Sequence, residues 1–163
     1  MEELNLSQNE LVHLNDAQLF SHSNILNYLG IANNRLVSLN ESLFVSLTNL
    51  KYLNINSNGL EFLNDMIFGK LESLLVLNLA NNSLLELDSY IFKGLVGLQV
   101  IYLNNNRLEA IDRNVFYGLA NLTTVYLGEN PISLTRPAYV SKLCVSNTNC
   151  VVYMNSTKIN KLN

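Results

Sequence analysis

The sequence predicts an α/β solenoid, in which one short strand from each coil joins its neighbours in a single parallel β-sheet. Three observations support this prediction. A leucine pattern recurs every 24 residues, each copy contains an alternating Leu-x-Leu segment, and an asparagine follows that segment after two intervening residues. A fixed repeat of this length is typical of arrays in which each unit packs only on its neighbours. The regular copies begin at Leu26, Leu50, Leu74, Leu98 and Leu122.

The strand of each coil follows from the alternation of its leucines. The copy that begins at Leu74 contains, in order, Leu77, Leu79, Asn82, Leu84, Leu87, Phe92 and Leu95. A period of two is typical of a half-buried strand, so Leu77 and Leu79 are expected to point inward and Asn78 outward. Burying a leucine contributes roughly 1.5–3 kcal/mol, but only when neighbouring coils cover it. One repeat therefore cannot fold alone.

An asparagine marks the point where each coil leaves its strand. A turn beside the core leaves backbone N–H and C=O groups without partners, and an amide side chain can satisfy both kinds. We expect each of these asparagines to face inward and to bond the backbone of its own coil and of the next, as a structural residue. They are Asn9, Asn34, Asn58, Asn82, Asn106 and Asn130.

A phenylalanine recurs on the return path of each coil. Phe44, Phe68, Phe92 and Phe116 lie 24 residues apart, which places them one above the other on the side opposite the sheet. This spacing predicts an aromatic spine that fills the core rather than a cofactor site.

The first copy departs from the repeat. It is one residue longer, its aromatic residue is Phe20, and His22 and Ser23 stand where later copies carry leucine. No capping segment precedes Met1. We therefore expect the inner face of the first coil to be poorly covered, as in a piece of a longer protein.

The pattern also changes after the last full copy. Pro137 suits the first turn of a short helix that Thr135 could cap. Beyond it the repeat spacing returns in degenerate form, with threonine in the asparagine position: Val152, Met154, Thr157, Ile159 and Leu162. We expect repeats over residues 1–133 and a C-terminal cap over residues 134–163, in which the first two residues of this set add one more strand.

If the leucines face inward, their neighbours form a displayed surface. The residue before the second leucine and the residue between the paired leucines give two outward columns. Tyr28 stands beside Tyr52 in these columns, and Tyr102, Tyr126 and Tyr153 form a stripe. Exposed tyrosine with small polar neighbours is a recurrent recognition composition, although β-rich surfaces favour tyrosine in any case. The candidate ligand-binding residues are Tyr28, Tyr52, Asn54, Val76, Asn78, Val100, Tyr102, Thr124, Tyr126 and Tyr153.

Composition argues against several kinds of partner and site. The net charge of -3 and the pI near 5.3 leave no basic patch for a nucleic acid. No apolar run reaches the ~18 residues of a membrane span, and the N-terminus does not begin like a signal peptide. The histidines, His13 and His22, have no nucleophile motif nearby, and no histidine–cysteine cluster suits zinc. We expect no enzymatic activity, no cofactor and no metal.

Two further features concern covalent modification. Cys144 and Cys150 are close enough in sequence for a local disulfide, with two buried free thiols as the alternative. Acceptor patterns for N-linked glycans are somewhat more frequent than the roughly three that chance would supply in so asparagine-rich a chain. They occur at Asn5, Asn40, Asn81, Asn121 and Asn155.

The repeat over residues 3–134 resembles the typical 24-residue subfamily of leucine-rich repeat proteins, found mainly in extracellular receptors, adhesion proteins and binders like the variable lymphocyte receptors. The resemblance implies a curved horseshoe with a concave sheet that binds proteins or glycans. It also implies an oxidising compartment, which would favour a Cys144–Cys150 bond. The chain departs from the family in two ways: two cysteines instead of four follow Asn130-Pro131, and the cysteine-bearing N-terminal cap is absent.

The leading hypothesis is therefore an extracellular module, secreted or part of a receptor ectodomain, that binds a protein or glycan on its concave face. The alternative is a spacer or assembly segment of a larger leucine-rich repeat receptor or adhesion protein. The stripe around Tyr126 is also compatible with a homodimer formed through the concave face.

Overall fold

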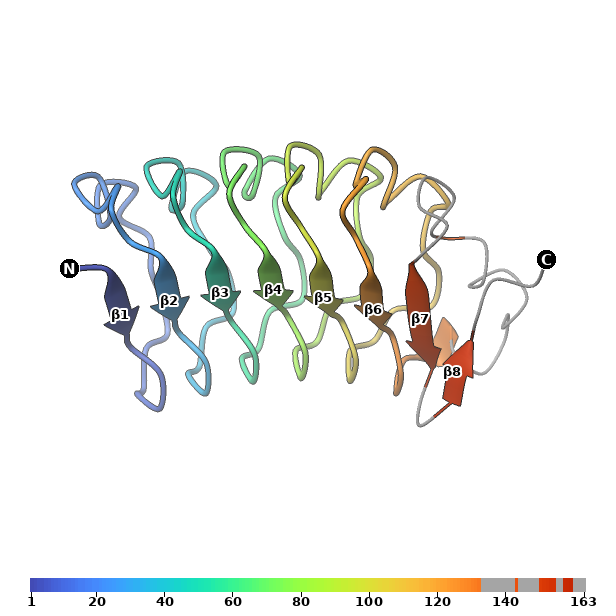
Figure 1. Cartoon of the computed structure of the whole chain (residues 1–163). Coiled ribbons are helices and arrows are strands. Elements are labelled where there is room, and N and C mark those ends of the chain that lie inside the picture. The colour runs from blue at the N-terminus through green and yellow to red at the C-terminus, as the bar shows by residue number, and fades with distance from the viewer. Residues whose placement is uncertain (133–142, 144–149, 155–156, 160–163) are drawn as a thin grey trace.

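The computed structural model describes residues 1–132, 143, 150–154 and 157–159, and its strands stand side by side along the axis of a solenoid (Figure 1). Each of the first seven strands comes from a coil of its own, in chain order. The strands are β1 (Glu3–Asn5), β2 (Tyr28–Gly30), β3 (Tyr52–Asn54), β4 (Val76–Asn78), β5 (Val100–Tyr102), β6 (Thr124–Tyr126), β7 (Val151–Met154) and β8 (Thr157–Ile159).

The register of the sheet reproduces the sequence repeat. Strands β1 to β7 pair in parallel, and from β2 to β6 paired residues lie 24 positions apart, as Tyr28 and Tyr52 do. The first pair joins Glu3 to Tyr28, which confirms that the first copy is one residue longer. The extra residue falls between Leu14 and Phe20, on the return path, so it leaves the strand pairing unchanged.

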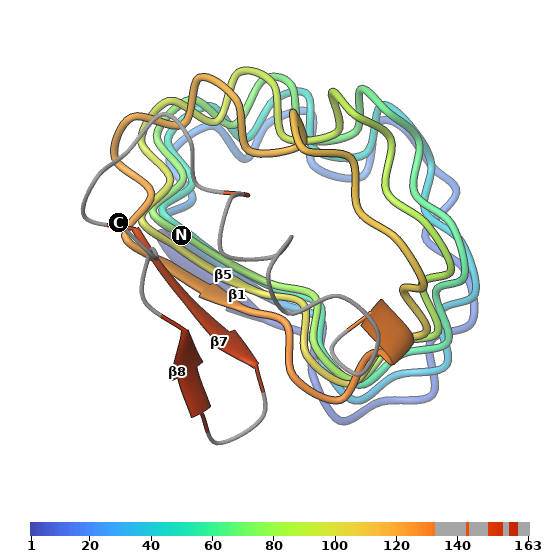
Figure 2. The same cartoon turned by 90° about the vertical axis from the view of Figure 1, so that its right-hand side faces the viewer.

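The inward and outward positions are those that the leucine alternation predicts. The central residue of each strand from β2 to β6 is at most 1% exposed, whereas its outward neighbours in β4, β5 and β6 are half-buried. Figure 2 shows that the return segments enclose the core opposite the sheet, and up to residue 130 they consist of turns and extended chain. The central residues are Leu29, Leu53, Leu77, Ile101 and Val125.

The repeated asparagines satisfy backbone groups at the exit of each strand. In the coil of β5, the Nδ2 of Asn106 donates to the carbonyl oxygens of Leu79 and Leu103, and its Oδ1 accepts from the N–H of Leu84. Asn106 is 6% exposed. Leu79 and Leu84 belong to the preceding coil. The sequence predicted bonds to the next coil, and this prediction was wrong, because each asparagine bonds the coil before it.

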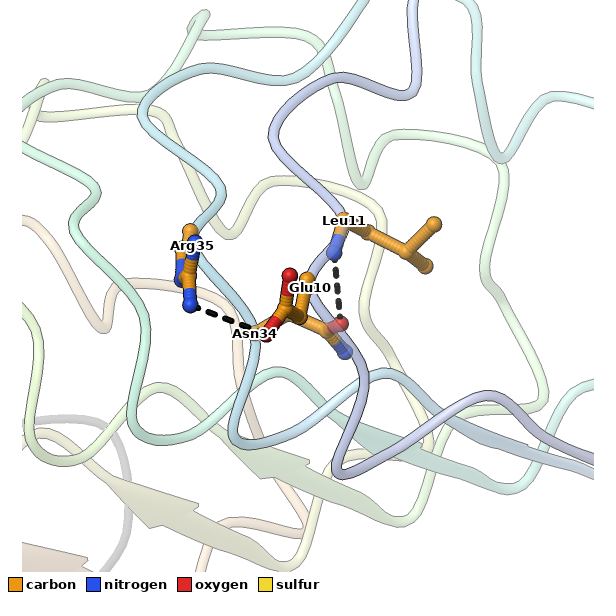
Figure 3. A network of polar contacts seen from close by, with 4 residues as sticks. All are labelled: Glu10, Leu11, Asn34 and Arg35. Carbon is orange, nitrogen blue, oxygen red and sulfur yellow. Dashed lines mark hydrogen bonds and ion pairs between the residues drawn. The ribbon is translucent and has the colours of Figure 1, made fainter.

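The same arrangement begins at the second coil. In Figure 3 the Oδ1 of Asn34 accepts from the N–H of Leu11 at 3.1 Å, and beside it Arg35 pairs with Glu10 at 3.1 Å. Both charged side chains are mostly in water, so this ion pair contributes little stability. Asn9, in the first coil, bonds carbonyl groups of its own coil and is exposed. Burial of the amide therefore depends on a preceding coil.

The phenylalanine spine is confirmed. The ring centroids are 6.2 Å apart between Phe44 and Phe68, 6.3 Å between Phe68 and Phe92, and 5.8 Å between Phe92 and Phe116. Neighbouring rings are inclined by 8–19° and all four are at most 2% exposed. The spine holds the return sides of consecutive coils together as the sheet holds their front sides.

One backbone conformation recurs in each of the first six coils. The residue immediately before each structural asparagine has a left-handed backbone, with φ between 53° and 60°. Asparagine tolerates this region better than most other residues, and three of the six positions carry it. We call this column the rim, and each of its residues lies three positions after a strand ends: Gln8, Asn33, Ser57, Asn81, Asn105 and Glu129.

The first coil is less well covered than the others, as expected. Leu4, Leu6 and Leu11 are partly buried, whereas Leu29 and Ile31 in the second coil are 0% exposed. The core is therefore continuous from the second coil onward and partly open at its N-terminal end.

The C-terminal end differs from the degenerate copy that the sequence suggested. Strand β7 joins β6 in parallel, as predicted, but the chain then reverses and β8 pairs antiparallel with β7, with Thr157 opposite Met154. Thr157 therefore opens a hairpin strand and does not take the position of the turn asparagine. Threonine has no amide donor for the carbonyl groups at a strand exit, and pairing with β8 satisfies backbone groups of β7 instead. The predicted helix at Thr135 and the residue Leu162 lie outside the described residues.

Candidate ligand-binding face

The outer side of the sheet displays all ten predicted ligand-binding residues at outward strand positions. Nine of them are half-buried, and Tyr52 is 45% exposed. The parallel register sets them in two columns, one through Tyr28, Tyr52 and Val76 and one through Asn54 and Asn78. We refer to this surface as the displayed face.

Three tyrosines form a stacked ladder at the C-terminal end of the displayed face. Tyr102, Tyr126 and Tyr153 occupy equivalent positions in β5, β6 and β7. The first two ring centroids are 4.6 Å apart with planes inclined by 1°, and the next two are 4.9 Å apart and inclined by 16°. These distances follow the spacing of neighbouring strands, about 4.8 Å. The sheet itself therefore holds the tyrosine ladder as one rigid aromatic surface.

The central hydroxyl of the ladder is electrostatically perturbed. Partial burial raises the pKa of Tyr126 above its usual 10.0, and the neighbouring phenols of Tyr102 and Tyr153 raise it further. Tyr126 is therefore protonated at neutral pH, and its hydroxyl can both donate and accept a hydrogen bond to a ligand.

The N-terminal tyrosines are arranged differently. Tyr28 and Tyr52 are neighbours in the register, as predicted. A Cβ atom placed on Gly30 would lie 2.7 Å from the hydroxyl oxygen of Tyr28 and 2.9 Å from the Oδ1 of Asn5, so the Tyr28 side chain extends along its own strand and its hydroxyl occupies the space that glycine leaves. Sequence reasoning did not single out Gly30. The available signal was a glycine in a column of larger side chains.

The asparagines of the displayed face, which were predicted to bind a ligand, also have a structural role. The Oδ1 of Asn54 accepts from the N–H of Asn56 at 3.2 Å, and the Oδ1 of Asn78 accepts from the N–H of Ala80 at 3.0 Å. Such local side-chain bonds stabilise the turn at the end of a strand. The carboxamide oxygens are therefore engaged with the backbone, and the asparagines contribute less freely to ligand binding than the tyrosines.

The displayed face is almost uncharged. From β2 to β7 its outward residues are tyrosine, valine, threonine, asparagine and glycine. In the first strand the column carries Glu3, and Lys51 directly precedes the outward position of Tyr52 in β3. A surface of this kind provides no row of cations for phosphate groups.

The glycan acceptor sites differ in their surroundings. Asn5 and Asn81 are exposed, at the end of β1 and on the rim. In Asn40 and Asn121 the amide nitrogen donates to a carbonyl group of the preceding coil, at 3.1 and 2.8 Å. Asn155 lies outside the described residues. A glycan at Asn5 or Asn81 would stand close to the displayed face.

The described part of the chain contains no arrangement of histidine, cysteine and acidic side chains that could hold a metal ion. Cys150 is buried, at 4% exposed, and Cys144 lies outside the described residues. Within the same residues, no helix has the length and apolar character needed to cross a membrane.

The comparison with family models gives two overlapping matches to the leucine rich repeat model, over residues 24–84 and 72–132. Together they cover more than half of the chain. No curated protein sequence matches it.

Several solved structures share the fold. The Toll–Spatzle complex of Drosophila matches with 30% identity and a TM-score of 0.77, over 80% of this chain and 17% of that one. TLR13 in complex with ssRNA13 matches with 28% identity and a TM-score of 0.75, over 79% and 18%. The leucine-rich repeat domain of APL1B matches with 25% identity and a TM-score of 0.73, over 79% and 38%. The chain thus spans less than two fifths of each of these structures.

Proposed function

The chain belongs to the leucine-rich repeat family, and we propose that it is a non-catalytic, extracellular recognition module that binds a protein ligand on its displayed face. The tyrosine ladder carries this proposal, because its three phenol rings stack at 4.6 and 4.9 Å on the outer side of the sheet. The fold does not require tyrosine there. The same column carries Asn5, Gly30, Asn54 and Asn78 in the first four coils.

A protein fits this face better than the other ligand classes. Tyrosine offers a large contact area at a low cost in side-chain entropy, and it is enriched among the residues that dominate protein interfaces. RNA, the ligand in the TLR13 complex, requires cations, and the outward residues from β2 to β7 include neither lysine nor arginine. A glycan that stacks on the phenol rings is the alternative ligand.

Replacing Tyr28, Tyr102 and Tyr126 together with alanine is expected to weaken binding by at least about 100-fold, because each hot-spot residue contributes roughly 2 kcal/mol or more. The ligand is first identified as a protein that the wild-type chain captures from extracellular material. Its affinity for both chains is then measured by calorimetry. Phe62→Ala is the matched control, since Phe62 is 55% exposed and lies on the return path outside the displayed face. Equal affinity of the triple variant and the wild type would exclude this face as the binding site.

A second copy of the chain is the competing occupant of the displayed face. Sedimentation of the purified wild type distinguishes the two cases, since a homodimer through the face would dissociate in the triple variant. A wild-type chain that sediments as a monomer excludes the dimer and leaves the face free for another protein.

A spacer or assembly role within a larger protein is the second candidate function. The observation that favours it is the partly open core of the first coil, where Leu4, Leu6 and Leu11 are only partly buried. A spacer would retain its partners when the three tyrosines are replaced, so the same affinity comparison separates a spacer from a binding module.

We also propose two covalent modifications that an extracellular location would favour. They are a Cys144–Cys150 bond within a C-terminal cap over residues 134–163, and glycans on some of the acceptor sites. The described residues contain no free cysteine, and Cys150 is buried. After expression through a secretory pathway, the chain is expected to resist alkylation until it is reduced. Treatment with an N-glycosidase should lower its mass and convert Asn5 or Asn81 to aspartate. Alkylation of both cysteines without reduction would exclude the disulfide.

A further inference from the structure

A hollow of about 550 Å³ opens on the return side of the solenoid, between the coil of residues 74–97 and the coil of residues 98–121. We call it the return-side groove. It lies apart from the displayed face, because its lining comes from the segments around Phe92 and Phe116 and not from the strands. Its apolar lining consists of Tyr90, Val96, Val115, Tyr117 and Leu119.

Three of these apolar side chains are exposed, although the fold does not require them. Tyr90 is 64% exposed, Val96 is 56% exposed and Tyr117 is 77% exposed. The inward positions of the same segments are filled by Phe92 and Phe116, which are buried. Exposed apolar residues that gather around a hollow mark an interaction site more often than a structural need.

An equivalent hollow earlier in the array serves as an internal comparison. It lies two coils towards the N-terminus, measures about 370 Å³, and includes Glu41, Asp65 and Lys70 in its lining. There Ser42 takes the place of Tyr90, and Gly69 takes the place of Tyr117, each 48 residues earlier. The repeat therefore produces the hollow, whereas the aromatic walls belong to the return-side groove.

The return-side groove has few polar groups in its lining, and one of them is positively charged. The lining contains Ser89, Asn114 and a single charged residue, Lys93. The Nζ of Lys93 lies 5.9 Å from the ring centroid of Tyr90, within the range of a cation–π contact. Beside them Gly118 leaves open space where a Cβ atom would stand. A groove with aromatic walls, open space beside Gly118 and one cation suits an apolar ligand that carries a single negative charge.

We propose that the return-side groove binds a small amphipathic monoanion, with its apolar or aromatic body between Tyr90 and Tyr117 and its carboxylate or sulfonate group at Lys93. A volume of about 550 Å³ falls within the usual range of small-molecule sites, about 300–1,000 Å³. A stable protein interface buries roughly 800 Å² on each partner, far more than three exposed apolar side chains provide. A small ligand is therefore favoured over a peptide segment.

The test uses 1-anilinonaphthalene-8-sulfonate, an aromatic sulfonate whose fluorescence reports its binding, with the full chain and with laurate as a competitor. We expect one probe per chain, displaced by laurate. Tyr117→Ser should weaken binding by about tenfold or more, because one aromatic wall is lost. Lys93→Gln should weaken it several-fold and remove most of its salt dependence.

Matched variants decide between this site and nonspecific adsorption. Met66→Ser removes an exposed apolar side chain from the equivalent hollow and should leave binding unchanged. Tyr117→Phe should retain binding, since it keeps the ring. Tyr102→Ala, on the displayed face, should also have no effect, so this inference can fail or succeed independently of the proposed function. Unfolding midpoints equal to the wild type confirm that the variants are folded. Equal losses in Tyr117→Ser and Met66→Ser, or unchanged affinity in Lys93→Gln, would overturn the proposal.

Discussion

Replacing Phe92 with alanine is expected to lower the free energy of unfolding by about 3–5 kcal/mol, the usual loss when a buried aromatic ring leaves a cavity. Phe92 is 0% exposed and stacks on both neighbours in the spine, with centroids 6.3 Å from Phe68 and 5.8 Å from Phe116. In a solenoid each coil packs only on the coils beside it. The cavity therefore weakens the link between the coils on either side, and the loss cannot be shared by a larger core.

Urea unfolding measures this loss, and amide hydrogen exchange locates it. Exchange should accelerate most in the coil of β4, which loses the ring, and in the coils of β3 and β5, whose phenylalanines stack on it. Phe62→Ala is the control, because Phe62 is 55% exposed and its loss should cost less than about 0.5 kcal/mol. A Phe92→Ala chain as stable as the Phe62→Ala chain would show that the spine contributes no more than a surface contact.

Replacing Asn106 with alanine is expected to cost about 3–5 kcal/mol, a loss comparable to that of the phenylalanine. The substitution leaves the buried N–H of Leu84 without its side-chain acceptor. It also removes one of the two asparagine donors from the carbonyl groups of Leu79 and Leu103, which keep their bonds from Asn82 and Asn130. A buried N–H without a partner costs roughly 1–3 kcal/mol, and each of the two hydrogen bonds lost at the carbonyl groups costs about 0.5–1.5 kcal/mol more. Because two of these three groups belong to the preceding coil, the change weakens the contact between coils as well as the turn.

Asn9→Ala is the matched control for this prediction. Asn9 has the same place in the repeat, but it is exposed and bonds carbonyl groups of its own coil. Its replacement should cost about 1 kcal/mol or less, since water can reach the groups it leaves. Equal losses at the two positions would show that the inter-coil bonds add nothing to the turn.

Most of the repeat architecture could be predicted from sequence, because one constraint applies to every copy. A leucine that faces inward in one coil must do so in the next, so alternation alone placed Leu77 inside and Asn78 outside. The strand register and the phenylalanine spine followed from the fixed period. The same regularity predicted that Tyr102 and Tyr126 are neighbours, and the structure adds that their rings are parallel.

The features that could not be predicted depend on groups that the pattern does not describe. The direction of the asparagine bonds depends on the stagger between coils, which residue spacing does not reveal. The reversal into β8 depends on how the backbone of β7 finds partners after the repeat ends, and Thr157 has the right spacing but the wrong chemistry for a turn. The position of Tyr28 depends on the missing side chain of Gly30 in its own strand. The return-side groove lies between two adjacent coils, so predicting it requires their three-dimensional shape, which the repeat pattern does not give.

The left-handed rim restricts how such an array can acquire new specificities. Six coils place a residue with φ between 53° and 60° three positions after the strand, next to the displayed face. A residue other than glycine, asparagine or aspartate costs roughly 1–2 kcal/mol in this conformation, whatever it could offer a partner. Variation for new ligands is therefore concentrated on the outward strand positions. A combinatorial library built on this chain should randomise those positions and keep asparagine or glycine on the rim.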